Sequence, residues 1–385
     1  MVEPLALWVT PVSDPGGVAR HVLDVARAGI PGFRFAVLCP PGPLAEQLRE
    51  AGAAVLTGPF GPGAADDGAR LGAARAVTAS AATLRNAVRT LRPAVVHSHL
   101  AYADIVCAAV LRGLPVQGAR ARGASGRTPL LVSTEHGIAG DASLYHASGR
   151  TARFRAGVHA RRLRRTDAVI AVSNATAKAM QERWGARDVV VIPNGIDRQG
   201  TTAVRHAASD GPRLLSLSRL APEKNLDALI HGVALLRETH PAARLTLAGE
   251  GGERDRLRAL VARAGLTDCV EMPGHVDAHE AMAQHDVVVQ LSRWENCSYT
   301  LLDAAAAGLG VVATDVGGNP AILPQRCLVP ERLAGSPTAV RDAILHQLDP
   351  AHAPTLPSGW PTIHDMTRRV AASYDGKFTN TEARP

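Results

Sequence analysis

The stretch Asp286–Val316, DVVVQLSRWENCSYTLLDAAAAGLGVVATDV, contains a strand, a loop, a helix and a second strand. The valine-rich runs at its two ends are typical of parallel strands that are buried on both faces. Ser298 is a suitable N-cap for a helix over Tyr299–Ala307, and Gly308 can end that helix in a left-handed conformation. The stretch therefore predicts part of a parallel sheet covered by helices.

Two acids mark this unit. Glu295 lies in the loop, whereas Asp303 interrupts a row of alanines, although aspartate is a poor interior helix residue and alanine the best one. With a rise of about 1.5 Å per residue, Asp303 lies about 7 Å along the helix. Both acids can then face a cleft, one reaching a ribose and the other a sugar hydroxyl. The alternative is a solvated Asp303 and an ordinary loop glutamate.

The same alternation of strands and helices runs along both halves of the chain. Strand-like runs occur at 5–11, 34–40, 53–58, 94–100, 130–136, 167–173 and 188–194, and again at 213–220, 243–251, 269–275, 286–292, 310–316 and 327–330. The expected domains are 1–196 and 213–358, with a polar linker at 197–212 and a terminal amphipathic helix at 359–378. This pattern predicts an α/β protein with two Rossmann-like domains facing across a cleft.

The composition predicts a globular protein in a reducing compartment. Of 385 residues, 46% are hydrophobic and 20% charged, so a sizeable core is available and wholesale disorder is not expected. The five cysteines are odd in number and lack C-x-x-C spacing, which favours a reducing, cytoplasmic location over a disulfide or zinc framework. No signal peptide and no run of 18 apolar residues is visible, so the protein is expected to be soluble or at most peripheral to a membrane.

Two cations follow the first strand of the second half. Arg219 and Lys224 precede a helix that starts at Leu226 and is expected to be capped by Asn225. Cationic side chains beside exposed helix amides form an anion site, and the end of such a strand is where a diphosphate should bind. The alternative is a surface loop with two solvated charges.

Glycine pairs follow two other strands. Gly16 and Gly17 open the first helix, and Gly249 and Gly251 follow a strand of the second half. A missing side chain lets the backbone approach a phosphate closely, but neither stretch is a G-x-G-x-x-G fingerprint, and ordinary tight turns remain the alternative.

Three histidines also follow strands, namely His97, His99 and His136. The position of His136, beside a glycine at a strand end, favours a functional role for this residue, whereas His97 is expected to be a core residue. No D-x-D occurs, so no divalent metal is expected on a diphosphate, and Arg219 and Lys224 must neutralise it.

The net charge of +7 is partly concentrated in one run: seven arginines fall within Arg150–Arg165 with no acid among them. They are Arg150, Arg153, Arg155, Arg161, Arg162, Arg164 and Arg165. A peripheral contact with an anionic membrane and a solvated helix face are both open interpretations, and no nucleic-acid partner is expected.

Taken together, these segments resemble the retaining nucleotide-sugar glycosyltransferases of the GT-B fold, glycosyltransferase family 4. The resemblance is carried by SRLAPEKN, LAGEGGE, MPGHV and ENCSYTLLDAAAAGLGVVATDVGGNPAIL in that order, together with VIPNGID before the linker. The family has two glutamates separated by seven residues, and here the pair is Glu295 and Asp303. Asp303 is thus one methylene shorter than the family's acid, and Asn225 stands where glycine is common.

The resemblance implies transfer of a sugar from a UDP- or GDP-sugar to a hydroxyl of a sugar, lipid-linked or small-molecule acceptor, without metal or cofactor. It implies that Glu295 contacts the donor sugar, Asp303 the ribose, and Arg219 and Lys224 the diphosphate, and that His136 lies at the reacting centre. The full predicted donor site comprises Gly16, Gly17, Arg219, Lys224, Gly249, Gly251, Gly274, His275, Val276, Glu295, Asn296, Ser298, Tyr299, Thr300 and Asp303.

Two other functions remain open from the sequence. One is a different GT-B enzyme, a sugar-nucleotide epimerase or a phosphorylase, which would act on donor alone. The other is a non-catalytic nucleotide-sugar-binding protein, which the shorter Asp303 suggests. The terminal helix at 359–378 looks like the family's helix that returns to the first domain.

Overall fold

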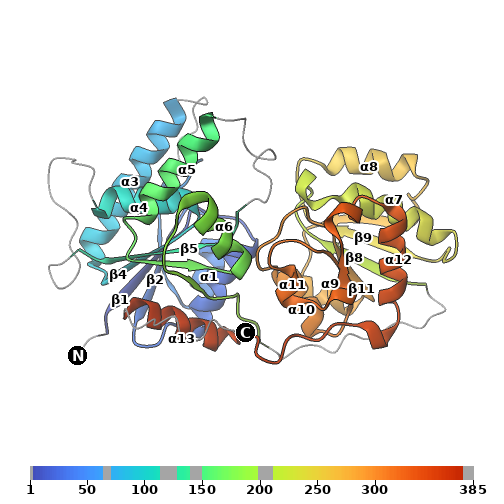
Figure 1. The fold of residues 1–385 in the computed structure, drawn as a ribbon. Coiled ribbons are helices and arrows are strands. Elements are labelled where there is room, and N and C mark those ends of the chain that lie inside the picture. The colour runs from blue at the N-terminus through green and yellow to red at the C-terminus, as the bar shows by residue number, and fades with distance from the viewer. Residues whose placement is uncertain (1–2, 64–70, 113–127, 139–149, 198–210, 376–385) are drawn as a thin grey trace. The chain divides into compact units, whose positions relative to one another are not determined.

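A computed structural model describes residues 3–63, 71–112, 128–138, 150–197 and 211–375 (Figure 1). These residues form two compact units. The first contains the described residues of Met1–Ile138, His146–Gly195 and Pro361–Pro385, and the second those of Ile196–Trp360. Most of the linker predicted at 197–212 lies outside the described residues, as do the last residues of the helix predicted at 359–378.

The first unit is built on a seven-stranded parallel sheet in the order β3-β2-β1-β4-β5-β6-β7. Its strands are β1 (Leu5–Val9), β2 (Arg34–Cys39), β3 (Ala54–Thr57), β4 (Val95–His99), β5 (Leu130–Glu135), β6 (Ala168–Ala171) and β7 (Val189–Val191). Its helices are α1 (Gly17–Ala28), α2 (Pro43–Glu50), α3 (Leu71–Leu91), α4 (Ala101–Arg112), α5 (Arg150–Leu163), α6 (Asn174–Trp184) and α13 (Ile363–Tyr374). The chain turns back between β1 and β4, so the order of the strands reverses there.

Both faces of this sheet are apolar because helices cover both. In β1, Ala6 and Trp8 belong to one buried cluster, and Leu7 and Val9 belong to another. This is the alternation that the two-residue period of a strand requires. Helix α13, from the end of the chain, packs beside α1 and adds Met366, Val370 and Tyr374 to the cluster that contains Trp8 (Figure 1).

The second unit has a six-stranded parallel sheet in the order β10-β9-β8-β11-β12-β13. Its strands are β8 (Arg213–Leu217), β9 (Arg244–Ala248), β10 (Val270–Gly274), β11 (Val287–Gln290), β12 (Gly310–Thr314) and β13 (Leu328–Val329). Its helices are α7 (Leu226–Arg237), α8 (Arg254–Arg263), α9 (Ala278–Ala283), α10 (Tyr299–Ala306), α11 (Asn319–Ile322) and α12 (Pro337–Gln347). Here the order of the strands reverses between β8 and β11.

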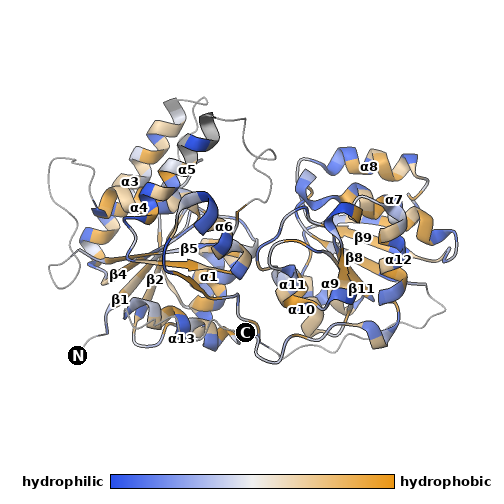
Figure 2. Ribbon diagram, viewed as in Figure 1, coloured by the Kyte–Doolittle hydropathy of each residue, from blue (hydrophilic) through white to orange (hydrophobic). Residues whose placement is uncertain are grey.

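Hydropathy follows the layers in each unit. The strands are apolar, whereas the outward faces of helices such as α8 are polar (Figure 2). Both sheets and their parallel direction confirm the α/β expectation, with every predicted strand run present. Among the described residues, no helix is both long and apolar enough to span a membrane.

Two helix ends predicted from the sequence have different outcomes. Ser298 caps α10 as expected, since its Oγ accepts a hydrogen bond from the Leu301 amide at 3.3 Å, and Gly308 follows that helix at φ +73°. Asn225 occupies the N-cap position of α7 as expected, but its side chain makes no capping hydrogen bond. Asn225 has a left-handed backbone at φ +52°, and its Nδ2 donates instead to the Ala334 carbonyl at 2.9 Å.

Candidate functional site

In the second unit, the predicted cation and acid meet at the point where strand order reverses. Lys224 lies in a short 3₁₀ helix, Pro222–Lys224, after β8, and Glu295 lies in the loop after β11. The Nζ of Lys224 is 3.0 Å from Oε2 of Glu295, and each side chain is 17% exposed. In open parallel sheets, ligands bind at the carboxyl ends of the strands at this reversal. The pair is therefore placed where a ligand should bind.

Two residues of the same unit orient Glu295. Gln290, the buried last residue of β11, donates from Nε2 to Oε2 of Glu295 at 2.8 Å. Ser298 donates from Oγ to Oε1 of Gln290 at 2.9 Å, so one hydroxyl both caps α10 and orients Gln290. Gln290 was not predicted as a site residue from the sequence. Its signal is a single polar residue at the end of an otherwise all-valine strand.

Arg219 occupies a more open position. Its side chain is 70% exposed, and Nη2 lies 2.6 Å from Oε1 of Glu223, which is buried. The Glu223 carbonyl accepts from the Arg293 amide at 2.8 Å, so the loops after β8 and β11 are joined by their backbones. Each predicted cation thus has a carboxylate beside it. The acids hold the cations in place and leave the local side-chain charge close to balanced.

The glycines after β9 have a packing role of their own. A Cβ on Gly249 would lie 2.0 Å from the Ser218 carbonyl oxygen, and one on Gly251 would lie 2.2 Å from that of Leu220. The Leu220 amide donates to the Glu250 carbonyl at 2.9 Å, which holds the two loops together. These glycines are therefore needed for close approach of two protein loops, whether or not a phosphate also approaches them.

A further glycine supports Glu295 and was not singled out from the sequence. Gly317 has φ +55°, and a Cβ there would lie 1.7 Å from the Glu295 carbonyl oxygen. The neighbouring Gly318 amide donates to the same oxygen at 3.4 Å. Only glycine fits this contact, so the loop after β12 determines the backbone position of Glu295.

Asp303 is buried in α10 with only 4% of its surface exposed, so the solvated alternative is wrong for this residue. The remaining predicted positions of the second unit differ in exposure. Gly274, Asn296, Ser298 and Tyr299 are buried, Val276 and Thr300 are half-buried, and His275 is exposed.

In the first unit, aromatic and histidine rings gather at the corresponding reversal between β1 and β4. His97 is fully buried, with Nδ1 2.7 Å from the Tyr374 hydroxyl and Nε2 2.7 Å from Oγ1 of Thr134. Trp8 donates from Nε1 to the same Tyr374 hydroxyl at 2.8 Å. Burial lowers the pKa of His97 well below its usual value. This environment confirms the interpretation of His97 as a core residue.

Three other histidines lie side by side in this cluster. Nδ1 of His99 is 2.9 Å from Nε2 of His136, and the His21 ring lies edge-on to the His136 ring with centroids 4.8 Å apart. Burial holds the pKa of His99 and of His136 well below the usual value and lowers that of His21 to about 4. All three imidazoles are therefore neutral near pH 7. His21 on α1 was not predicted.

The glycine turn of the first unit is open. Gly16 and Gly17 are exposed at the N-terminus of α1, and a Cβ on either would meet nothing within 4 Å. Unlike Gly249 and Gly251, they do not contact another loop closely. The helix amides that follow them can receive an acceptor from solvent or from a ligand.

The basic run contains a buried member, which corrects its interpretation as one charged face. Arg162 is 3% exposed and pairs with Asp104 of α4 and with Glu135, the last residue of β5, at 2.7 Å for the latter. Two acids and one guanidinium thus share the interior beside His136. Burial raises the pKa of Asp104 to about 7 and that of Glu135 above its usual value, since one arginine neutralises only one of them.

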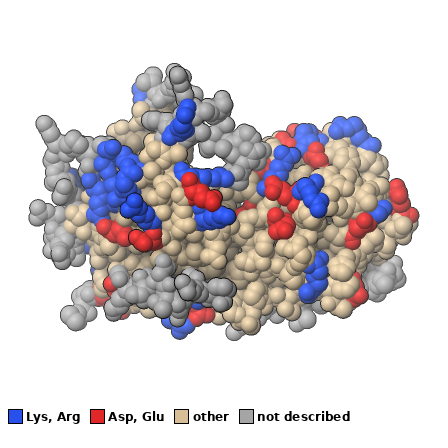
Figure 3. Space-filling model, in the orientation of Figure 1, with Lys and Arg blue, Asp and Glu red and all other residues tan. Residues whose placement is uncertain are grey.

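Other arginines of the run do lie at the surface. Arg153, Arg161 and Arg164 are exposed, and the side chains of Arg150 and Arg155 fall outside what the structure describes. Lys and Arg side chains gather over the region of α4 and α5 on the face shown in Figure 3.

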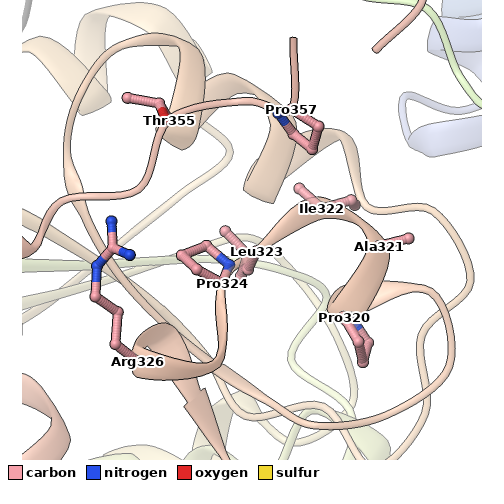
Figure 4. A pocket seen from close by; sticks show the side chains of 8 residues that line it. All are labelled: Pro320, Ala321, Ile322, Leu323, Pro324, Arg326, Thr355 and Pro357. Atoms are coloured by element: carbon pink, nitrogen blue, oxygen red, sulfur yellow. The ribbon is translucent and has the colours of Figure 1, made fainter. Parts of the chain in front are cut away.

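A separate surface pocket lies in the second unit. Pro320, Ala321, Ile322, Leu323, Pro324, Arg326, Thr355 and Pro357 line it, mainly from α11 and the segment after it (Figure 4). None of the predicted site residues is among them, and the lining offers one cation and no acid.

Comparison with known proteins assigns both units to one family. Residues 15–199 match Glycosyltransferase Family 4, and residues 211–349 match Glycosyl transferases group 1. Glycogen synthase of Mycobacterium tuberculosis (strain CDC 1551 / Oshkosh) is 29% identical over 304 residues, covering 73% of this chain and 69% of that protein. The gpi3 subunit of phosphatidylinositol N-acetylglucosaminyltransferase from Schizosaccharomyces pombe is 32% identical over 140 residues, 35% of this chain and 31% of its own length.

Solved structures show the same fold. Sucrose-phosphate synthase from Thermosynechococcus elongatus has a TM-score of 0.69 at 19% identity and covers 97% of this chain and 95% of its own. Anabaena Alr3699/HepE, solved with UDP and glucose, has a TM-score of 0.68 at 20% identity, with 96% and 95% covered. The chain has the GT-B fold of two Rossmann-like domains and belongs to the group 1 glycosyl transferases of glycosyltransferase family 4.

Proposed function

We propose that this glycosyltransferase moves a sugar from a nucleoside-diphosphate sugar to an acceptor hydroxyl with retention of configuration and without a metal ion. The observation that carries the proposal is the Lys224–Glu295 pair, 3.0 Å apart where the strand order of the second sheet reverses. It provides a cation for a phosphate and a carboxylate for a sugar hydroxyl within one ligand's length.

In this proposal the second unit binds the donor. Lys224 and Arg219 hold the diphosphate. Their partners Glu295 and Glu223 offset much of the positive charge of these two side chains, and helix amides supply additional positive potential. As the bond from the sugar to the diphosphate breaks, charge builds on the leaving oxygen, and donors already in position stabilise it. The departing diphosphate accepts the proton of the attacking hydroxyl. Glu295 binds the sugar and the buried Asp303 binds the ribose.

Relatives favour a UDP-linked donor over a GDP-linked one. Structures with this fold were solved with UDP and with UDP-glucose. Curated relatives include peptide N-acetylglucosaminyltransferase GtfA subunits whose names specify UDP-N-acetylglucosamine. We propose that the product belongs to a polysaccharide, glycolipid or other cell-envelope glycan.

The first unit is proposed to bind the acceptor. His136 is held by His99 at the end of β5, directly after Glu135 and its ion pair with Arg162. The open turn at Gly16 and Gly17 supplies amides at the end of β1.

Membrane contact is a further part of the proposal. The exposed Arg153, Arg161 and Arg164 favour an acceptor at an anionic surface on the cytoplasmic side. Sedimentation with liposomes of rising anionic-lipid content tests this, and binding that is independent of anionic lipid would contradict it.

A donor screen followed by product analysis tests the transfer reaction. UDP, GDP and their common sugars are first compared for the rise in melting temperature, since a ligand bound to the folded chain stabilises it by mass action. The best donor is then incubated with hydroxyl acceptors, and release of nucleoside diphosphate and the anomeric configuration of the product are measured. An epimer or a sugar phosphate formed from donor alone, or donor binding without release under any acceptor, would overturn the proposal.

A further inference from the structure

We infer that His21, His99 and His136 form a binding site for one divalent transition-metal ion, with Zn²⁺ as the best match. The inference concerns affinity for an ion and assigns that ion no part in the transfer reaction; His136 belongs both to this cluster and to the acceptor unit proposed above, and the test below measures metal binding alone. It rests on the positions of three imidazoles and on two ring nitrogens that lack partners among the described residues.

The three side chains come from three elements and meet at one point. His21 lies on α1, His99 ends β4, and His136 follows β5. One ring nitrogen from each lies within 4.8 Å of the others. Ligands of a zinc ion at about 2.0–2.1 Å lie closer to one another than this, so small side-chain rotations complete the set.

Two of these nitrogens are buried without a hydrogen-bond partner in the part of the chain that the structure describes. They are Nε2 of His21 and Nε2 of His99, in side chains that are 2% and 0% exposed. A buried polar atom left unsatisfied destabilises the fold, and such atoms in folded proteins call for an explanation. A bound ion satisfies both nitrogens at once.

His97 shows what a purely structural histidine looks like in the same cluster. Both of its ring nitrogens have partners, Tyr374 at 2.7 Å and Thr134 at 2.7 Å. Within the described residues, His21 and His99 each have only one nitrogen engaged. The difference separates a core histidine from two candidate ligands.

A hydrogen bond on the far side of the ring prepares His21 as a ligand. Its Nδ1 lies 3.2 Å from Oδ1 of Asn194, an acceptor, so Nδ1 carries the proton and Nε2 carries the lone pair. Metal-bound histidines commonly have this arrangement, in which the far nitrogen donates to an oxygen. His136 is half-buried, so a water can occupy a fourth position, as in open zinc sites with three histidines. Neutral imidazoles favour Zn²⁺ over Mg²⁺ or Ca²⁺, which prefer oxygen.

The test is metal binding by the intact, tag-free chain. After dialysis against buffered Zn²⁺, we expect one tightly held ion per chain, and X-ray absorption should show about three imidazole nitrogens at about 2.0 Å. Replacing His21 or His99 with Ala should abolish this ion. Asn194→Ala should weaken binding by about 10–100-fold, because it removes the oxygen that orients His21.

Two controls keep the result interpretable. His275→Ala removes an exposed histidine of the second unit and should leave the stoichiometry at one. If a variant at His21 or His99 fails to fold, the X-ray absorption spectrum of the unaltered chain alone tests whether histidine nitrogens bind the ion. No ion above the level of the His21→Ala, His99→Ala double variant, or a spectrum without histidine ligands, would overturn the inference.

Discussion

Lys224 and Glu295 are 71 residues apart in sequence and 3.0 Å apart in the structure. If Lys224 holds the donor diphosphate, Lys224→Ala should lower kcat/KM for transfer by about 10²–10³-fold, the usual effect of removing one preorganised donor. The measurement is release of nucleoside diphosphate at several donor concentrations.

Lys178→Ala is the matched control for this variant. Lys178 is a lysine on α6 of the first unit, with its side chain 75% exposed, and the substitution should leave kcat/KM unchanged. Equal activity of the Lys224→Ala variant and the unaltered chain would remove Lys224 from the donor site.

Asp303 tests the ribose contact. Asp303→Asn keeps the shape of the side chain but removes its charge, so the donor KM should rise while the melting temperature changes little. A loss of one charged hydrogen bond is about 1.5–3 kcal/mol, or roughly 10–100-fold in donor affinity. Calorimetric titration with the nucleoside diphosphate measures it. A nucleoside diphosphate that lacks the ribose hydroxyls should bind the Asp303→Asn variant and the unaltered chain equally. A difference in affinity for this ligand would contradict a contact between Asp303 and the ribose.

At the scale of elements, α4, α5 and β5 meet through the buried ion pairs of Arg162. Arg162→Met leaves Asp104 and Glu135 without their cation, and breaking a buried pair in this way costs about 3–5 kcal/mol. Hydrogen exchange of the β4 and β5 amides should therefore accelerate. Arg161→Met alters the exposed neighbouring residue and should leave exchange unchanged. Equal exchange in both variants would show that the pair does not hold these elements together.

The buried Asp104 predicts that the stability of the first unit depends on pH. The pKa of Asp104 is raised from 3.8 to about 7, so the folded state holds a proton that the unfolded state releases. The stabilisation from this proton is complete below about pH 4 and is lost as pH rises to about 7. The lowered pKa of His21, about 4, acts in the opposite direction, so the comparison must isolate Asp104.

Asp104→Asn provides that comparison. Relative to this variant, the first unit of the unaltered chain should lose up to about 1.4 kcal/mol of unfolding free energy per pH unit between about pH 4 and pH 7. Urea unfolding at each pH, with a pulse of hydrogen exchange in β4 and β5, measures the difference. A difference that does not vary with pH would show that Asp104 is ionised throughout.

At the scale of the whole molecule, the last helix completes the core of the first unit. The Tyr374 hydroxyl contacts Trp8, 366 residues earlier, and His97. Tyr374→Phe leaves two buried polar groups without this partner and should destabilise the first unit by about 1–3 kcal/mol. Arg368→Ala, on the exposed side of α13, should have little effect. Unfolding of the first unit at the same urea concentration in both variants would contradict this role.

Much of the fold and part of the site could be predicted from the sequence. Valine-rich runs such as Val287–Gln290 indicate buried parallel strands whatever surrounds them, and Ser298 and Gly308 mark the ends of a helix because capping is local. Family motifs then pointed to Arg219, Lys224, Glu295 and Asp303. Asn225 lies at the N-cap of α7 as expected, but its side chain bonds to Ala334, and the sequence could not indicate that contact because it is not local.

By itself, the sequence determined the properties that depend on neighbouring residues. These are the strand and helix periods, the helix ends, the two-unit organisation and the family motifs. Only the tertiary structure decided which distant residues meet. Arg162 looked like a surface charge until Asp104 and Glu135 were placed around it. His21 had no signal in α1, since its neighbours in the cluster arrive on β4 and after β5. Parallel sheets bring the ends of distant strands together, and no local sequence pattern indicates which side chains will meet there.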